Sequence, residues 1–342
     1  MRSLLPESKI MASWEYGPDA PLVSICCIAY NQESYIKDAL EGFLIQKTDF
    51  PFEILVHDDA STDNTAQIIR QYAKKYPRLF KPIYQFENQY SKGLRVNPVF
   101  NFTRALGDYI ALCEGDDYWT SPNKLQIQVD EIRKHPGVDT IFHPANQLID
   151  GKIGREICKY GLKKKLFTIS EVIRGDGGFS PTNSLIFRRK ALLKLPKWFY
   201  EDTPVGDLYL QIFGSMNGGA LYIPQNMSVY RVNSMGSWSR EVNSLEKMVK
   251  LSEKSNIAIE LLRTHLGASF YSDIDFLKSK TYYKLATFYL CNDIEDKFRE
   301  TISKAYNLKP SFYRVKLLYF LRHISLALFV FKWLKIGKIS RR

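Results

Sequence analysis

Three carboxylates within four residues, Glu114-Gly115-Asp116-Asp117, constrain this chain more than any other feature. They directly follow the apolar run 109–113, which predicts a buried strand. Like charges this close repel one another, and burying them without partners costs several kcal/mol, so they must meet solvent or a cation. Mg²⁺ and Mn²⁺ take carboxylate ligands and complete their shell with water and phosphate oxygens. The cluster therefore indicates either a divalent metal site or an acidic loop after a strand.

A second acidic pair, Asp58-Asp59, ends another apolar run, residues 52–57. An earlier run at 22–29 is separated from it by a stretch in which Leu40, Phe43 and Leu44 repeat at helical spacing. Strands joined by a helix are parallel, and parallel strands end at one edge of a sheet, where open α/β sheets bind ligands. The pattern predicts that both acidic strand ends face one crevice suited to a nucleotide and a metal ion.

The order and spacing of several motifs resemble the family 2 glycosyltransferases over residues 20–240. The resemblance implies the GT-A fold, a Rossmann-like mixed sheet flanked by helices, and an inverting enzyme that uses a nucleotide-sugar. The motifs that carry it are VSICCIAYNQESYI, ILVHDDASTDNT, GDYIALCEGDDYWTSPNKLQIQVD, GDLYL and YRVNSMGSWS.

The resemblance also assigns roles to individual residues. Tyr30 and Glu33 are expected to line the nucleotide pocket, and Asp58 or Asp59 to receive a uracil-type base. Glu114 to Asp117 stand at the family's Asp-x-Asp metal motif, but its first position is Glu114 rather than Asp. Asp116 and Asp117 are therefore the expected ligands of Mn²⁺ or Mg²⁺. The remaining expected contacts to the donor are Ala29, Ser61, Gly115 and Asp116. From their charge, Lys92 in a polar loop and Arg231 or Arg240 are expected to meet the phosphates, with a solvated loop as the alternative for Lys92.

Asp207 stands at the family's general base, which would accept the proton of the acceptor hydroxyl. Two other interpretations stay open from the residues alone. Asp207 precedes an apolar helical stretch and could serve as its N-cap, and the nearby acids Glu201 and Asp202 could act in its place. The stretch Ser234–Arg240, with glycine, serine and tryptophan, is expected to close over the diphosphate, unless it is only a structural turn.

Length and composition predict one large α/β domain with an appendage. We expect an N-terminal extension at 1–20 and a catalytic domain at 21–240, divided into a nucleotide half (21–120) and an acceptor half (121–240). Residues 151–183, rich in glycine and lysine, are expected to form a mobile acceptor-side segment. From 241 to 342 the pattern is helical. Five cysteines, an odd number, and a start without a signal-peptide pattern predict a reduced cytoplasmic protein.

The net charge of +12 is concentrated in the tail. From Thr301 onward there are ten lysines or arginines and no acidic residue. In a helix, Arg314, Arg322, Lys332 and Lys335 would share one arc, which predicts a basic amphipathic element on an anionic membrane surface. Peripheral attachment to the inner face of the cell membrane follows. A helix packed on the protein body and nucleic-acid binding are the alternatives, but no nucleic-acid-binding motif accompanies the charge.

These features together predict transfer of a hexosyl or N-acetylhexosaminyl group from a nucleotide-sugar, most simply a UDP-sugar. The expected acceptor is a hydroxyl of a glycan or of a lipid-linked molecule, in bacterial surface polysaccharide synthesis. Two alternatives are a sugar-nucleotide pyrophosphorylase-like enzyme and a catalytically inactive GT-A scaffold. The first would call for a glycine-rich phosphate loop near the N-terminus, where this chain has Cys-Cys-Ile-Ala-Tyr-Asn.

Overall fold

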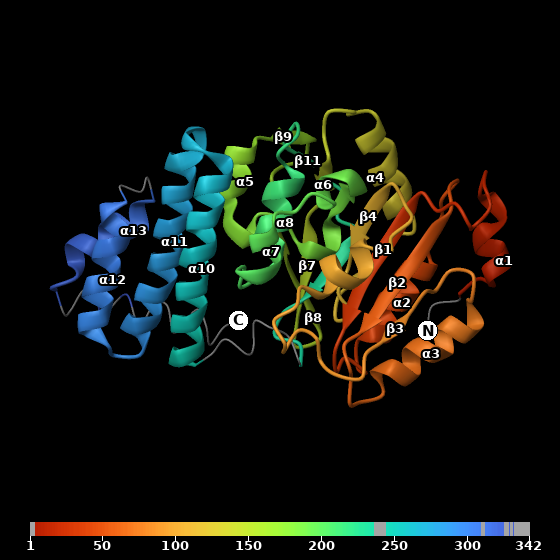
Figure 1. Ribbon diagram of the computed structural model, residues 1–342, viewed down its shortest axis with the longest axis horizontal. Coiled ribbons are helices and arrows are strands. Elements are labelled where there is room, and N and C mark those ends of the chain that lie inside the picture. The colour runs from red at the N-terminus through yellow and green to blue at the C-terminus, as the bar shows by residue number, and fades with distance from the viewer. Residues whose placement is uncertain (1–3, 236–243, 309–311, 325–327, 329–330, 332–342) are drawn as a thin grey trace. The chain divides into compact units, whose positions relative to one another are not determined.

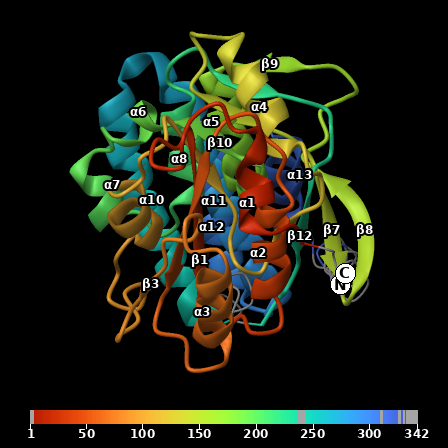
Figure 2. The same cartoon turned by 90° about the vertical axis from the view of Figure 1, so that its right-hand side faces the viewer.

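Eight strands form the central sheet, in the order β3-β2-β1-β4-β10-β6-β11-β9 (Figures 1 and 2). β1 to β4 run parallel, whereas β10 is antiparallel to both of its neighbours, so the sheet is mixed. The strands are β1 (Val23–Ala29), β2 (Phe52–Asp58), β3 (Ile83–Tyr84), β4 (Tyr109–Leu112), β6 (Thr140–Phe142), β9 (Lys165–Phe167), β10 (Ile186–Arg188) and β11 (Ala220–Tyr222).

The computed structural model describes residues 4–235, 244–308, 312–324, 328 and 331. It divides into a larger unit, Met1–Glu201 with Gly206–Arg240, and a helical unit, Asp202–Val205 with Glu241–Arg342. The helices of the larger unit are α1 (Glu7–Ile10), η1 (Met11–Ser13), α2 (Ile36–Leu44), α3 (Thr65–Lys75), η2 (Asn97–Phe102), α4 (Lys124–Arg133), α5 (Ile169–Gly175), η3 (Asp176–Gly178), η4 (Thr182–Ser184), α6 (Arg189–Leu192), α7 (Lys197–Glu201) and α8 (Asp207–Gly214).

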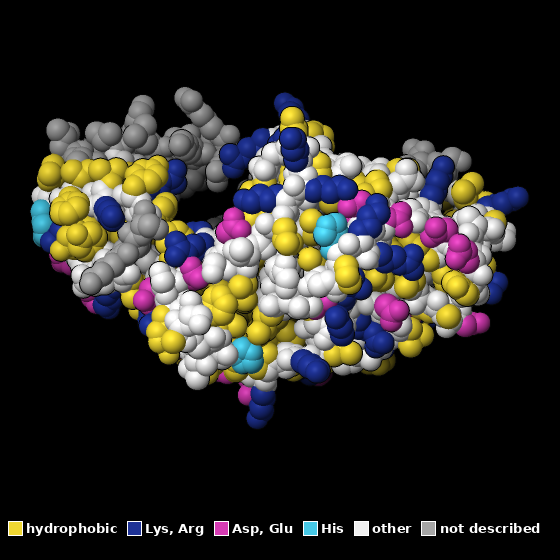
Figure 3. Space-filling model, turned by 90° about the horizontal axis from the view of Figure 1, so that it is seen from above, with side chains coloured by type: hydrophobic (Ala, Val, Ile, Leu, Met, Phe, Trp, Pro, Cys, Tyr) yellow, Lys and Arg dark blue, Asp and Glu magenta, His cyan; other side chains and the backbone are white. Residues whose placement is uncertain are grey.

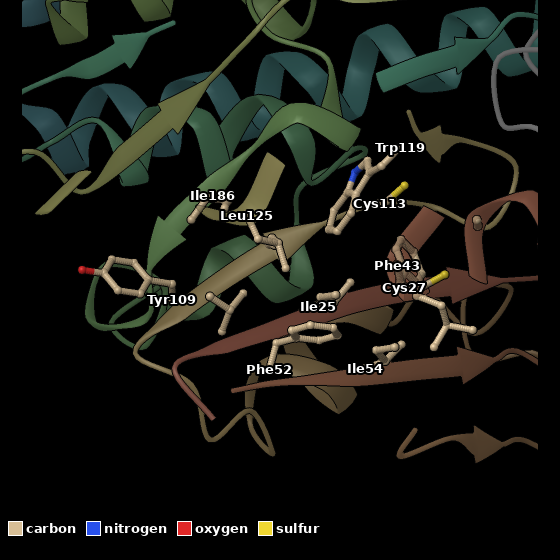
Figure 4. Close-up of a cluster of buried hydrophobic side chains, with 14 of the residues drawn as sticks. Ile25, Cys27, Phe43, Phe52, Ile54, Tyr109, Cys113, Trp119, Leu125 and Ile186 are labelled. Atoms are coloured by element: carbon tan, nitrogen blue, oxygen red, sulfur yellow. The ribbon is translucent and has the colours of Figure 1, made fainter. Parts of the chain in front are cut away.

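The main hydrophobic core lies on one face of the central sheet and includes alternate residues of β1. In β1, Ile25 and Cys27 point to the side on which α2, α3 and α4 lie, and they join one buried cluster with Phe43 and Leu125 (Figure 4). Because side chains alternate along a strand, the intervening residues face the opposite side of the sheet. Trp119 packs edge-on against Phe43, with ring centroids 4.9 Å apart. All five cysteines are free thiols, as predicted.

A smaller four-stranded sheet lies beside the end of β4, in the order β5-β12-β7-β8. Its strands are β5 (Tyr118–Trp119), β7 (Ala145–Ile149), β8 (Lys152–Ile157) and β12 (Ser228–Arg231). Asp150-Gly151 forms the tight turn between β7 and β8: both residues have positive φ, 48° and 76°, as such a turn needs.

Residues 151–183, for which the sequence predicted a mobile segment, contain regular secondary structure. That stretch contains β8, β9 and α5, and α5 begins with a complete capping box. Thr168 accepts a hydrogen bond from the N–H of Glu171, whose carboxylate accepts one from the N–H of Thr168. Glycine and lysine content concealed this local signal.

The helical unit consists of α10 (Leu245–Leu266), η5 (Ala268–Phe270), α11 (Tyr271–Cys291), α12 (Glu295–Asn307) and α13 (Tyr313–Leu321). The predicted helical pattern after 241 is confirmed for the described residues. α11, α12 and α13 share a buried cluster that includes Leu290, Phe298 and Leu318. Within the described parts of the chain, no helix combines the length and apolarity that crossing a membrane requires.

Candidate active site

The acidic strand ends meet at one edge of the sheet, as predicted. β1 lies between β2 and β4 and is parallel to both, with Ala29 opposite Asp58. The pairing continues past the strands: the N–H of Asp59 donates to the carbonyl of Ala29 at 2.9 Å, and the N–H of Gly115 donates to the carbonyl of Ile28 at 2.9 Å. Asp58-Asp59 and Glu114–Asp117 therefore flank the end of β1.

Gly115 permits this close approach. A Cβ atom at position 115 would lie 2.4 Å from Oε1 of Gln32, 2.9 Å from Cδ1 of Ile36 and 3.1 Å from Cβ of Ala29. A side chain at this position would require Gln32 and Ile36, at and before the start of α2, to shift. Glycine thus holds the backbone of the acidic cluster against β1, which is the role a close backbone approach requires. Ala29 contributes its small side chain to the same contact.

Asp116 and Asp117 are buried, with 7% and 1% of their surfaces exposed. Oδ1 of Asp117 accepts a 2.8 Å hydrogen bond from the backbone N–H of Arg231. Oδ2 of Asp117 is buried and has no hydrogen-bond partner among the described residues. The hydroxyl of Ser234 donates to Oδ2 of Asp116. Each carboxylate is therefore fixed through one oxygen.

Arg231 holds this cluster from β12. Its guanidinium donates to the backbone carbonyl of Asp116 at 2.5 Å and forms an ion pair with Asp38 at the start of α2. The same group lies over the rings of Tyr35 and Tyr118, 5.0 and 4.9 Å from their centroids. Both rings restrict the guanidinium, so Arg231 joins the acidic cluster to α2 and also supplies a positive charge. No sequence signal marked Asp38 or Tyr35 as its partners.

The electrostatics of the cluster favour a cation. Burial raises the pKa of Glu114, and the charges of Asp207 and Asp116 raise it further. Burial and the charge of Asp116 raise the pKa of Asp117. The pKa of Asp116 is also raised by burial, although its hydrogen bond from Ser234 and the charge of Arg231 oppose the shift. One arginine does not balance these acids, and a divalent ion would.

Asp207 is the first residue of α8, and it is not the helix cap. Gly206 is the N-cap residue and makes no side-chain capping hydrogen bond. Instead Oδ2 of Asp207 accepts a 3.0 Å hydrogen bond from the hydroxyl of Thr182. Burial raises the pKa of Asp207, while that hydrogen bond and the charge of Arg95 lower it. Thr182 lies in η4, which leads into β10, and the N–H of Leu112 at the end of β4 donates a 3.1 Å hydrogen bond to the carbonyl of Leu185 between them, so Thr182 holds Asp207 on the β4 side of the sheet.

The two candidate base-binding acids are not equivalent. Both oxygens of Asp59 are occupied, by the N–H groups of Gln89 at 2.8 Å and Tyr90 at 3.0 Å. Burial raises the pKa of Asp59, but these bonds and one from His57 outweigh it and lower the value overall. Asp58 accepts one 3.3 Å bond from the N–H of Ser61, and its Oδ1 is buried with no partner among the described residues. Burial raises its pKa. Asp59 anchors the 87–94 loop, and Asp58 is free to meet a ligand.

Several other residues predicted to contact the donor form hydrogen bonds or ion pairs within the protein. Oε2 of Glu33 accepts bonds from the backbone N–H of Asn64 at 2.9 Å and from its side-chain amide at 2.7 Å. Oγ of Ser61 accepts a 3.0 Å bond from the N–H of Asn31. These bonds tie together the loops that follow β1 and β2. Lys92 pairs with Glu87 within its own exposed loop. Tyr30 follows β1 directly and is 37% exposed, so its ring is accessible at the strand edge.

The residues present fit a metal ion that shares its shell with a ligand. Among the residues that the structure describes, no three His, Cys, Asp or Glu side chains converge as a complete metal site. Mg²⁺ and Mn²⁺ sites that bind diphosphates use only one or two carboxylates and leave the other positions to phosphate and water. The unpartnered, buried Oδ2 of Asp117 beside Asp116 matches that requirement. Of the stretch Ser234–Arg240, expected to close over the diphosphate, residues 236–240 lie outside the described residues.

A buried lysine lies beneath the site. Lys124 is fully buried, donates to Oε1 of Gln128 at 2.7 Å and lies 4.0 Å from the ring centroid of Trp119. Gln128 donates in turn to the carbonyl of Ser184, and the indole N–H of Trp119 donates to the carbonyl of Asn183, each at 2.8 Å. This network joins the strand after Asp117 to the η4 turn that carries Thr182. Nothing in the sequence around Lys124 indicated this network.

Comparisons of sequence agree with this geometry. The profile described as Glycosyl transferase family 2 matches residues 24–195. An uncharacterised protein of Mycobacterium tuberculosis is 39% identical over 221 residues, which cover 63% of this chain and 60% of the relative. A Bacillus subtilis protein named for teichuronic acid biosynthesis, TuaG, is 34% identical over 120 residues, 35% of this chain and 43% of its own. The match thus spans less than two thirds of these relatives.

Solved structures show the same fold. TarS of Staphylococcus aureus, solved with UDP-GlcNAc, superposes with a TM-score of 0.60 at 18% identity over 93% of this chain and 91% of its own. The mannosyltransferase PcManGT of Pyrobaculum calidifontis, solved with GDP-Man and Mn²⁺, gives 0.53 at 17% identity over 98% and 91%. The fold is the GT-A fold, as predicted. The chain belongs to the family 2 glycosyltransferases, as predicted.

Proposed function

We propose that this glycosyltransferase moves a sugar from a UDP-sugar to an acceptor hydroxyl with inversion at the anomeric carbon. One observation carries the proposal: Asp116 and Asp117 follow β4, whereas the carboxylate of Asp207 is held separately by Thr182 in η4, the turn that leads into β10 beside β4. The first pair suits the diphosphate side of a donor. The single acid beside it suits the attacking hydroxyl.

The donor is proposed to enter at the end of β1. Asp58, with its buried free oxygen, would accept a hydrogen bond from the N–H of a uracil ring, and Tyr30 would offer a ring surface beside it. Support for UDP comes from the fold likeness to TarS. That protein was solved with UDP-GlcNAc, and the match covers 91% of its chain. Lys92 and Arg231 are the cations proposed to approach the phosphates.

Asp116 and Asp117 would hold Mn²⁺ or Mg²⁺ together with the donor diphosphate. When bound, the ion neutralises the charge that develops on the leaving diphosphate. The protein's own contribution is to fix both carboxylates through Ser234 and Arg231, so that little reorganisation is needed when the donor arrives. The Mn²⁺ in the PcManGT structure supports the proposal.

Asp207 is proposed as the general base. As the acceptor oxygen bonds to the anomeric carbon, its proton passes to the carboxylate of Asp207, and the bond from that carbon to the diphosphate oxygen breaks with its electron pair on the leaving group. Attack opposite the leaving group inverts the configuration. A raised pKa makes a carboxylate a better proton acceptor near neutral pH, and Thr182 holds the carboxylate in place.

The acceptor is proposed to be a hydroxyl of a glycan or of a lipid-linked saccharide in surface polysaccharide synthesis. The name of the TuaG relative supports this class. A pyrophosphorylase-like reaction and an inactive scaffold are the competing activities. Neither has a specific observation in its favour, because β1 leads into Ala29-Tyr30-Asn31 rather than a glycine-rich loop and the acidic cluster is intact.

A donor-hydrolysis screen tests the proposal. UDP- and GDP-sugars are incubated with the protein in Mn²⁺ or EDTA, and release of the nucleoside diphosphate is followed. Release of UDP only with Mn²⁺ is the expected result, and NMR of a transfer product should show the inverted anomer. Formation of a nucleoside triphosphate from added pyrophosphate would identify a pyrophosphorylase. If the protein neither binds nor turns over any donor, it is an inactive scaffold.

A further inference from the structure

We infer that the exposed face of α13 binds an anionic membrane surface. Tyr313, Leu317, Phe320 and Ile324 are between 46% and 65% exposed. Their spacing of four, three and four residues places them along one side of the helix and its continuation. We call these four residues the apolar stripe. Hydrophobic side chains gather over the α12–α13 end of the helical unit in the space-filling view (Figure 3).

The opposite face of α13 is already occupied. Val315 and Leu318 are fully buried in the cluster formed with α11 and α12. Tyr319 stacks on Tyr306 with ring centroids 3.9 Å apart and planes 2° from parallel. A helix that is apolar on both faces normally buries both. Here packing fixes one face of the helix to the unit and leaves the apolar stripe uncovered among the described residues.

Positive charge borders the apolar stripe on both sides. Arg314 and Lys316 are exposed and lie at the helical positions that flank it. No acidic residue follows Glu300, and ten basic residues do. Arg322, which the sequence placed on the basic arc, instead covers the ring of Tyr319 at 3.8 Å and donates to its backbone carbonyl. Lys332 and Lys335, the other members of that arc, lie outside the described residues.

An apolar centre with basic edges matches the boundary between acyl chains and anionic headgroups. A second copy of the chain is a poorer occupant. In a two-fold dimer the same patch faces itself, which would bring Arg314 and Lys316 against their own copies, and α13 itself carries no acidic residue to pair with them. Anionic lipid supplies both an apolar phase and the missing negative charge. The two earlier interpretations of the tail, packing on the body and membrane contact, thus apply to opposite faces of one helix.

Co-sedimentation with vesicles tests the inference without any transfer reaction, so its failure is distinct from failure of the proposed function. The full chain is mixed with vesicles of phosphatidylcholine alone or with phosphatidylglycerol. We expect binding to the mixed vesicles and little to the neutral ones. L317S with F320S should weaken it at least about tenfold, since two apolar side chains no longer leave water. R314Q with K316Q should lower the affinity for the mixed vesicles by roughly fivefold for each charge removed.

The matched control is L106S with L162S, the same change at two exposed leucines of the larger unit. It should bind vesicles like the wild type, and circular dichroism should show all variants folded. Wild-type binding by the stripe variant, or equal binding to neutral vesicles, would overturn the inference. So would a wild-type dimer in analytical ultracentrifugation that the stripe variant converts to monomer while vesicle binding is unchanged.

Discussion

The backbone N–H of Arg231 donates a 2.8 Å hydrogen bond to Oδ1 of Asp117, a residue 114 positions earlier in the chain. This bond orients the carboxylate so that its second oxygen, Oδ2, stays buried and unpartnered among the described residues. A buried, unpaired carboxylate oxygen costs free energy unless a ligand satisfies it. Through this bond, β12 fixes the orientation of a carboxylate that we propose as a metal ligand.

We predict that Asp117→Asn removes Mn²⁺-dependent UDP binding. The amide is a weaker metal ligand and carries no charge, so the affinity should fall by more than the roughly 10–100-fold typical of an outer-shell change. Calorimetry of UDP binding in Mn²⁺ and in EDTA measures it. Asp116→Asn should behave similarly. The control Asp38→Asn alters an acid that touches Arg231 but not the proposed ion, and its effect should be smaller. Equal affinity in all variants would exclude the metal assignment.

The same acids should make the metal-free protein less stable at higher pH. Their folded-state pKa values are raised above the unfolded ones, so between these values the folded state binds more protons than the unfolded state. Stability is then full below the unfolded pKa, near 4, and is lost as pH rises through the folded values. In EDTA, the unfolding free energy of Asp117→Asn relative to wild type should increase with pH. Denaturant titrations at several pH values measure this difference in unfolding free energy. A difference that does not change with pH would contradict the prediction.

How far the sequence could lead depended on whether the signal was local. The strand ends at Asp58 and Asp117 were predictable because apolar runs and the parallel connection place them at one edge. The Asp150-Gly151 turn was predictable from two residues. By contrast, the Arg231–Asp117 bond joins distant segments through a backbone group, which no residue type encodes. For the same reason Thr182 drew no attention until the fold set it beside Asp207.

We predict that Asp207→Asn binds donor normally but transfers slowly. A general base acts on the acceptor proton, so its loss should lower kcat by about 10²–10⁴ and leave the dissociation constant of UDP unchanged. Single-turnover assays and calorimetry separate the two quantities. Glu201→Gln, the same kind of change at a nearby exposed acid, should keep wild-type turnover. More than half of wild-type turnover in Asp207→Asn would exclude the base assignment.

Thr182→Val tests the hydrogen bond that holds the base. The hydroxyl of Thr182 stabilises the charged carboxylate of Asp207 and so lowers its pKa. Its loss should raise that pKa and move the rising, acidic limb of the kcat/KM profile to higher pH. Turnover at high pH should recover toward wild type, because the base is still present. A uniformly lower profile with an unmoved acidic limb would show that Thr182 acts only through packing.

The last prediction concerns Lys124, whose pKa burial lowers to about 7. In the unfolded chain it titrates near 10.4, so between about pH 7 and 10 the unfolded state binds the extra proton and stability should rise with pH. Lys124→Met removes this titration. The unfolding free energy of wild type relative to the variant should therefore rise by up to about 1.4 kcal/mol per pH unit. Lys134→Met, an exposed lysine at the end of the same helix, is the control and should show a flat difference. Denaturant unfolding at several pH values measures all three proteins. Equal slopes for wild type and Lys124→Met would mean that the lysine stays charged beneath the site, and the network to Trp119 and Gln128 would then contain a buried cation throughout this range.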